Sequence, residues 1–265
     1  MLFRTRRSRF LLWLAFGVLF GVVIAAPLAM VGLAAVAGTW NGVLPAEYTA
    51  RHLADAASGD ALASALVSVQ TGLVASLAAV LVGTWAALAV RSAPRPVRRV
   101  VDTLLHLPVA VPSVVVGLSL LVAFSQPPLA LNGTRWIVLV AHLVIVLPFG
   151  YGVVSGALDR ADPALAEVAA SLGAPPALVL WRVRLPLLAP ALSASASLSL
   201  ALSMGEVGAT VMLYPPDWRT LPVSVFAQAD RGEVFLAAAS TVVLLGLTLV
   251  GLLTLGLAKG RAAER

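Results

Sequence analysis

The sequence predicts an all-α integral membrane protein with six transmembrane helices, both termini in the cytoplasm, and a short helical loop between the fourth and fifth helices. Three observations predict this fold: an apolar composition, six long apolar runs, and an uneven distribution of Lys and Arg. Of the 265 residues, 60% are hydrophobic and 11% are charged, and the mean hydropathy is +0.98. A soluble domain carries about 25% charged residues. This chain therefore has too little polar surface to cover a globule in water.

Six runs with few or no charged residues are long enough to cross a bilayer, which requires about 20 apolar residues in a helix. They place the spans at about residues 10–38, 61–90, 100–124, 135–157, 187–213 and 234–258. The first run follows several arginines and contains an Ala-Val-Ala sequence at 35–37, features that a cleaved signal peptide would share. The apolar region of a signal peptide is only about 7–15 residues long. We therefore expect a retained helix.

The basic residues predict the orientation of the spans, because cytoplasmic loops of membrane proteins are enriched in Lys and Arg. With the N-terminus inside, all but four of the 18 Lys and Arg residues fall on the cytoplasmic side. The four on the outer side are Arg51, Arg135, Arg219 and Arg231. The net charge of +6 is thus explained by membrane topology, and we expect membrane lipid, not nucleic acid, around the chain.

The connections between the spans predict a single transmembrane domain over residues 1–265. The outer loops, at about 38–60, 125–135 and 214–232, are too short to form an additional domain. No strong internal repeat or linker divides the chain. It contains no cysteine, which excludes a disulfide framework and a thiolate metal site, and no metal site is expected.

The longest inner connection, at about 158–186, has a pattern of residues that a simple loop does not need. Asp162 is a good helix N-cap and Pro163 suits the first helical position, where a missing N–H costs nothing. A short helix is expected from there to about Leu172. Gly173 then stands at the position where a glycine in a left-handed conformation commonly ends a helix.

A second short helix is expected to begin at Pro175 or Pro176 and to end at Pro186, because proline disrupts a helix interior. The connection would then be a helix, a glycine turn and a second helix on the cytoplasmic face. An alternative is an amphipathic hairpin that lies in the lipid interface with its arginines toward the headgroups.

The same stretch carries a Glu, small residues, a Gly six positions after the Glu, and then a branched apolar residue followed by Leu-Pro. This order resembles the EAA signature of permease subunits of ABC importers, with Val168 in place of the usual first alanine. The resemblance implies a coupling loop that docks into a groove of a cytoplasmic ATPase and transmits its motion. The residues implied in coupling are Glu167, Ala169, Ala170, Gly173, Ala174, Val183, Leu185 and Pro186.

The resemblance covers nearly the whole chain. Residues 204–232 resemble the fifth helix and outer loop of permeases that serve iron, sulfate, molybdate, thiamine and phosphonate importers. Together with residues 40–45 and 111–134, they are similar to the permease subunit of 2-aminoethylphosphonate importers. The resemblance implies import of a small anionic solute, 2-aminoethylphosphonate, with sulfate, molybdate, iron or thiamine as alternatives.

The resemblance also implies the partners and the location of the protein. It implies a bacterial inner membrane complex with a cytoplasmic ABC ATPase dimer, a second permease subunit of the same or another sequence, and a periplasmic binding protein. The chain has no Gly-x4-Gly-Lys-Ser/Thr pattern, the phosphate-binding loop of many ATPases. We therefore expect ATP and magnesium on the partner ATPase and no cofactor on this chain, which would be a transporter subunit and not an enzyme.

Three serines in the fifth run share one helix face. Ser195, Ser199 and Ser203 recur every four residues. They could line a polar translocation pathway. Small residues also let membrane helices pack closely, and this second explanation fits them equally well.

Glu206 lies in the outer part of the same run, where a carboxylate is costly and suggests a function. It could gate the pathway, or it could pair with Arg219 or Arg231, which could themselves bind an anion. The structural alternative is that Glu206 caps the packing near the interface. His142 and His106 have no second ligand at metal spacing, so we expect them to form hydrogen bonds between helices.

Two other classes of protein fit the sequence less well. An intramembrane enzyme would need paired carboxylates, a metal cluster or a Ser–His pair at membrane depth, and the sequence offers no convincing arrangement of this kind. A secondary transporter is expected to show several intramembrane charges and matching interrupted helices in two halves. Glu206 alone gives little support to it.

Overall fold

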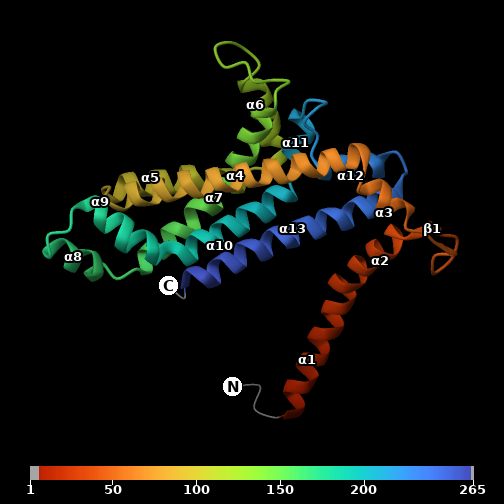
Figure 1. The fold of residues 1–265 in the computed structure, drawn as a ribbon, viewed down its shortest axis with the longest axis horizontal. Coiled ribbons are helices and arrows are strands. Elements are labelled where there is room, and N and C mark those ends of the chain that lie inside the picture. The colour runs from red at the N-terminus through yellow and green to blue at the C-terminus, as the bar shows by residue number, and fades with distance from the viewer. Residues whose placement is uncertain (1–5, 264–265) are drawn as a thin grey trace. The chain divides into compact units, whose positions relative to one another are not determined.

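A computed structural model describes residues 6–263 of the chain, and the described part is predominantly helical (Figure 1). It divides into two compact units. The first contains the residues up to Ala63 together with Ser224–Val243, and the second contains Ser64–Val223 together with the chain from Leu244 onward.

The first unit begins with a continuous helix that is apolar enough to span a membrane. Its segments are α1 (Arg6–Phe20), a π-helical turn (Gly21–Ala25) and α2 (Ala26–Ala35). The helix ends at Ala35, three residues before the predicted end, because the chain then forms a strand. Strand β1 (Ala37–Thr39) pairs antiparallel with β2 (Glu47–Tyr48). The all-α prediction is therefore wrong for this one small hairpin.

The rest of the first unit packs near the end of α2. Helix α3 (Arg51–Ala56) follows the hairpin, and the unit also contains most of α12 (Leu221–Asp230) and the start of α13 (Val234–Ala263). A small core joins α2, α3 and α13 through Ala35, Ala56 and Ala239.

In the second unit, α7 (Arg135–Arg160) is the central helix and packs against α10 (Leu185–Met204). Helix α4 (Gly59–Arg91) also contacts α7, at a point where two glycines remove the side chains between the backbones. A Cβ on Gly83 would lie 2.6 Å from the Tyr151 nitrogen, and a Cβ on Gly150 would lie 2.5 Å from the Ala79 carbonyl oxygen. Small residues commonly allow such close packing of membrane helices.

The predicted third span is not one straight helix. It consists of α5 (Arg95–His106), a 3₁₀ turn (Leu107–Ala110) and α6 (Ser113–Ala123), with a bend of 108° between the two parts. Val111 is extended and precedes Pro112. Proline disfavours the α conformation in the residue before it, and this explains why the helix breaks here.

The predicted fifth span starts earlier than expected. After α8 (Ala164–Ser171), α9 (Pro176–Val179) runs through a π-helical turn (Leu180–Arg184) directly into α10. The prediction that Pro186 ends the preceding helix is therefore wrong. In the π-helical turn the N–H of Leu185 bonds to the carbonyl of Leu180, five residues back, and this wider turn accommodates a proline that has no N–H to donate.

The fifth span also ends earlier than expected. Helix α10 stops at Met204, and the short helix α11 (Gly208–Leu213) follows after a break at residues 205–207. The predicted end at residue 213 therefore falls in a separate helix. Helix α11 packs against α6 and α7.

Within the described residues, five helices are long and apolar enough to cross a membrane, and the bent pair α5–α6 makes up to six. The five are Leu12–Ala35, Gly59–Arg91, Arg135–Arg160, Pro176–Met204 and Val234–Leu257. Each of the six apolar runs of the sequence thus corresponds to one of these helices or to the bent pair.

Candidate functional site

The segment between α7 and α10 has the local structure that its residues predict. The Ala164 N–H donates to Asp162 Oδ1 at 2.9 Å at the start of α8. At the other end Gly173 has a φ of +85°. The Gly173 N–H bonds to the Ala170 carbonyl and the Ala174 N–H to the Ala169 carbonyl. This pair of bonds is the Schellman motif, which requires a left-handed residue at the glycine position.

A hollow of about 380 Å³ lies between α8 and the start of α10. Among its lining residues are Glu167, Ala170, Ala174 and Val183, four of the eight residues that the signature implies in coupling. Arg91 at the end of α4 and Arg184 also line it. Small residues therefore face this hollow, with charged groups beside them.

Helix α8 exposes apolar residues away from this hollow. Leu165, Val168 and Leu172 are exposed, and Leu172 is 82% accessible. Val168 stands where the signature usually has alanine, and its larger side chain extends into open space. The departure from the signature therefore causes no clash within this chain.

The three serines of α10 face α7 and are buried. Ser195 donates to the Gly150 carbonyl at 3.3 Å, and the Ser203 hydroxyl lies 2.7 Å from His142 Nδ1. The buried Ser199 hydroxyl has no hydrogen-bond partner among the described residues. These contacts favour the packing explanation, and the pathway explanation stays a prediction.

His142 joins both sides of the break between α10 and α11. Its Nδ1 contacts Ser203 on α10, and its Nε2 lies 2.9 Å from the Thr210 hydroxyl on α11. The prediction that His142 forms hydrogen bonds between helices is confirmed. His106 instead contacts the backbone carbonyl of Asp102 on its own helix, at 2.8 Å, so the same prediction is wrong for this residue's hydrogen bond.

Glu206 caps α11. Its Oε1 accepts a hydrogen bond from the Ala209 N–H at 2.7 Å, and no ion pair of Glu206 occurs among the residues described. Arg231 pairs with Glu233 at 3.2 Å, and the buried Arg219 Nε has no partner in the described part of the chain. These contacts favour the structural alternative, in which Glu206 caps the packing near the interface and does not act as a gate.

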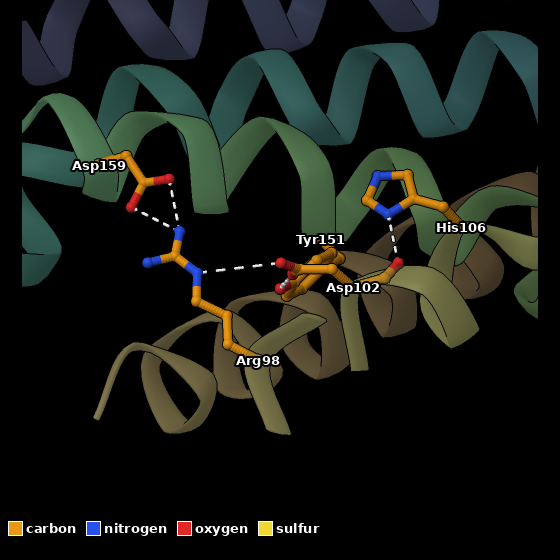
Figure 2. A network of polar contacts seen from close by, with 5 residues as sticks. All are labelled: Arg98, Asp102, His106, Tyr151 and Asp159. Atoms are coloured by element: carbon orange, nitrogen blue, oxygen red, sulfur yellow. Dashed lines mark hydrogen bonds and ion pairs between the residues drawn. The ribbon is translucent and has the colours of Figure 1, made fainter. Parts of the chain in front are cut away.

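A polar network joins α5 and α7, and the sequence did not predict it (Figure 2). Arg98 Nη2 donates to both carboxylate oxygens of Asp159, at 2.8 and 2.7 Å. Arg98 Nε lies 3.8 Å from Asp102 Oδ2, and the Tyr151 hydroxyl donates to Asp102 Oδ1. Only the i,i+4 spacing of Arg98 and Asp102 could have indicated it, because Tyr151 and Asp159 are more than 45 residues away in the sequence.

Residues 6–263 contain no group of three or more His, Cys, Asp or Glu side chains that could hold a metal ion.

Comparison with known proteins identifies the family. Residues 79–259 match the family model described as the inner membrane component of binding-protein-dependent transport systems. The chain belongs to this family. It is therefore a multi-pass inner membrane permease of an ABC importer, a family whose members work with a binding protein.

Individual relatives agree with this permease assignment. The chain is 47% identical over 233 residues to PhnV of Salmonella paratyphi A, whose name refers to a 2-aminoethylphosphonate transport system, with 88% of each chain covered. It is 33% identical to ModB of Mycobacterium tuberculosis, named as a molybdenum transport permease, over 62% of this chain and 67% of that one.

Solved structures share the fold of this permease. A chain of a bacterial alginate ABC transporter, solved in complex with an alginate-bound periplasmic protein, matches with a TM-score of 0.75. The match covers 96% of this permease and 95% of that chain at 18% sequence identity. At this identity the likeness describes the fold and says nothing about the solute.

Proposed function

We propose that this permease translocates 2-aminoethylphosphonate delivered by a periplasmic binding protein. The observation that carries the proposal is the 47% identity to PhnV over 88% of both chains. The same solute is supported by the sequence of residues 40–45, 111–134 and 204–232, which resemble the permease of 2-aminoethylphosphonate importers.

We further propose that residues 158–186 couple the permease to ATP hydrolysis on a separate subunit. The complex would contain an ATPase dimer that binds ATP and magnesium, and a second permease subunit of the same or another sequence. The hollow beside α8 and its small lining residues support this role, because small side chains allow a partner's backbone to approach. The coupling residues would be those of the signature, from Glu167 to Pro186.

The proposed topology has both termini and the coupling segment on the cytoplasmic side, with residues 1–265 as one transmembrane domain. The uneven distribution of Lys and Arg supports it. The role of Ser195, Ser199, Ser203 and Glu206 in a pathway stays a prediction, and their burial and the capping contact of Glu206 favour a structural role.

A second candidate solute is molybdate. The relative named as a molybdenum permease supports it, at 33% identity over 62% of this chain. Both solutes are small oxyanions, so the basic residues of the outer loops suit either.

Uptake of labelled 2-aminoethylphosphonate tests the solute. Cells that carry the permease together with its ATPase and binding-protein genes should accumulate the label, and cells without the permease gene should not. Uptake of labelled molybdate in its place would reject the phosphonate proposal and leave the family assignment intact.

The coupling role is tested by Gly173→Leu. A left-handed conformation disfavours any residue with a Cβ, so this change should distort the turn after α8 and abolish uptake while the protein still inserts into the membrane. Gly133→Leu is the matched control, since Gly133 has a similar φ of +74° and equally open surroundings. If both variants retain full uptake, residues 158–186 are better explained as a hairpin in the lipid interface.

A further inference from the structure

The polar network of Figure 2 connects the end of α7 to the bend between α5 and α6. Asp159 is the second-last residue of α7, and α8 begins five residues later. His106 is the last residue of α5 and lies five residues before the break at Val111–Pro112, where the chain bends by 108° toward α6. Between these two points lie Arg98, Asp102 and Tyr151, with the His106 ring edge-on to the Tyr151 ring at 5.7 Å.

The two ends of the network differ in burial. Tyr151 is 1% exposed and packs in a core with Val154, Leu158 and Leu188. The side chains of Arg98 and Asp159 are 36% and 50% exposed. An ion pair with this exposure is screened by water and contributes little to folding stability, so it can open and close without unfolding the helices.

Arg98 has a second carboxylate within reach. Asp102 lies one helical turn further along α5, 3.8 Å from Arg98 Nε. Residues four apart on a helix are neighbours, so the two side chains stay close when the helix moves as a rigid body. If Asp159 moves away from α5, Arg98 keeps the ion pair with Asp102. The bridge between α5 and α7 can therefore break without leaving the Arg98 guanidinium unpaired, and water solvates the half-exposed Asp159 carboxylate.

The bent pair α5–α6 leads from this bridge to the helix break at residues 205–207. Helix α6 lies directly on α11, because a Cβ on Gly117 would come within 2.8 Å of the Ala209 Cα and carbonyl oxygen. Backbones this close must move together, since packed elements shift between discrete arrangements and do not deform gradually. A displacement of α5 and α6 would therefore also displace α11.

We propose that Arg98 and Asp159 are positioning residues that form a releasable latch between the base of α8 and the bent pair α5–α6. The latch is closed in this structure. When a partner ATPase displaces α8, the Arg98–Asp159 bridge opens, Arg98 stays with Asp102, and the bent pair, still bonded to α7 through Asp102 and Tyr151, can pivot about that bond and reposition α11. The inference rests on the proposed coupling function, because it requires that α8 be moved by a partner.

The test is the ratio of solute imported to ATP hydrolysed by the complete transporter, reconstituted in proteoliposomes with labelled 2-aminoethylphosphonate. Asp159→Asn keeps the size of the side chain and removes its charge. We expect the ratio to fall about two- to fivefold, the change that losing an exposed ion pair produces, and ATP hydrolysis without binding protein to rise, because movement of α8 no longer depends on α5. Asp159→Glu, which keeps the charge, should restore most of the ratio.

The matched control is Glu233→Gln, which breaks the comparably exposed Arg231–Glu233 pair between residues two positions apart. It should leave the ratio unchanged. A purely structural role for Asp159 would lower the amount of assembled transporter but not the ratio per assembled complex. An unchanged ratio for Asp159→Asn would overturn the latch.

A second variant applies if Asp159→Asn does not assemble. The chain contains no cysteine, so a double change of Arg98→Cys and Asp159→Cys provides the chain's only two thiols for a bifunctional maleimide. Cross-linking should hold the two helices together and suppress both uptake and stimulated ATP hydrolysis. Transport at the rate of the uncross-linked double variant would overturn the proposal.

Measurements of solute import and of ATP hydrolysis distinguish a failure of the latch from a failure of the proposed function. If the unaltered transporter hydrolyses ATP but imports no 2-aminoethylphosphonate, the solute assignment fails. The latch is then judged on hydrolysis without binding protein, which Asp159→Asn should still raise. If the unaltered transporter imports solute and Asp159→Asn matches it in both measurements, only the latch fails.

Discussion

At the residue scale, the close backbone packing of α4 on α7 in the second unit depends on two glycines that have no side chains. Gly83 and Gly150 let α4 and α7 meet backbone to backbone, with virtual Cβ positions 2.5–2.6 Å from the other helix. The atoms in the way are backbone nitrogen and oxygen, which cannot rotate aside as a flexible side chain can. One methyl group at either position must therefore push the two helices apart.

We predict that Gly150→Ala destabilises the permease by about 1–3 kcal/mol, the usual cost of overpacking a well-filled core. The fraction of folded protein that survives heating in detergent, followed by gel filtration, measures this loss. Gly246→Ala on α13 is the control, because a Cβ there meets nothing within 4 Å, and alanine has the higher helix propensity. Equal survival of the two variants would contradict the packing argument.

At the scale of elements, the break between α10 and α11 is stabilised by side chains of α7, α10 and α11 and of the break itself. His142 of α7 bonds to a hydroxyl on each side of the break, and Glu206 within it accepts the Ala209 N–H. A helix start has N–H groups without partners in the helix itself. The carboxylate of Glu206 satisfies one of them and stabilises the first turn of α11.

Substitutions of Glu206 distinguish whether its side chain caps α11 or acts as a charged gate in translocation. Glu206→Gln keeps a side-chain oxygen that can accept the bond, whereas Glu206→Ala removes it and should cost about 0.5–2 kcal/mol, as the loss of a cap does. Thermal stability and solute uptake are measured for both. We expect the Gln variant to transport normally. Loss of uptake in a stable Gln variant would show instead that the charge itself acts in translocation.

At the scale of the whole molecule, the proposed membrane topology rests on the distribution of basic residues. Arg91 and Arg160 end α4 and α7, and Arg98 lies in the first turn of α5. Arg91 and Arg98 lie near the last turn of α7 at one side of the second unit. The Arg91 guanidinium donates to the carbonyl of Leu158 there. A basic rim of this kind is typical of the cytoplasmic side of a membrane protein.

Single cysteines in the cysteine-free chain test the orientation. Val43, between β1 and β2, is 91% exposed, and Leu172 at the end of α8 is also well exposed. A membrane-impermeant maleimide added to spheroplasts should label Val43→Cys and leave Leu172→Cys unlabelled until the membrane is opened. The opposite pattern would invert the proposed topology and place α8 out of reach of a cytoplasmic ATPase.

The sequence predicted the membrane helices and the turn after α8 well, because both depend on local chemistry. A long apolar run can be recognised as a membrane helix without knowing which helices pack against it. Gly173 adopts the left-handed conformation that the end of α8 requires. The breaks were predicted less well. Pro112 favours an extended Val111 and so a break in the helix, but it lies inside a long apolar run that was predicted as one span. Pro186 was predicted to end a helix, although a π-helical turn accommodates it.

The sequence by itself therefore determined the class of protein, the apolar runs that form the candidate spans, the glycine turn after α8 and the family resemblance. Each of these depends on composition or on residues within a few positions of one another. Only the tertiary structure decided which polar groups meet. His142 with Ser203 and Thr210, and Arg98 with Asp159, are about 60 or more residues apart, and such pairs exist only because packing of the apolar helices brings them together.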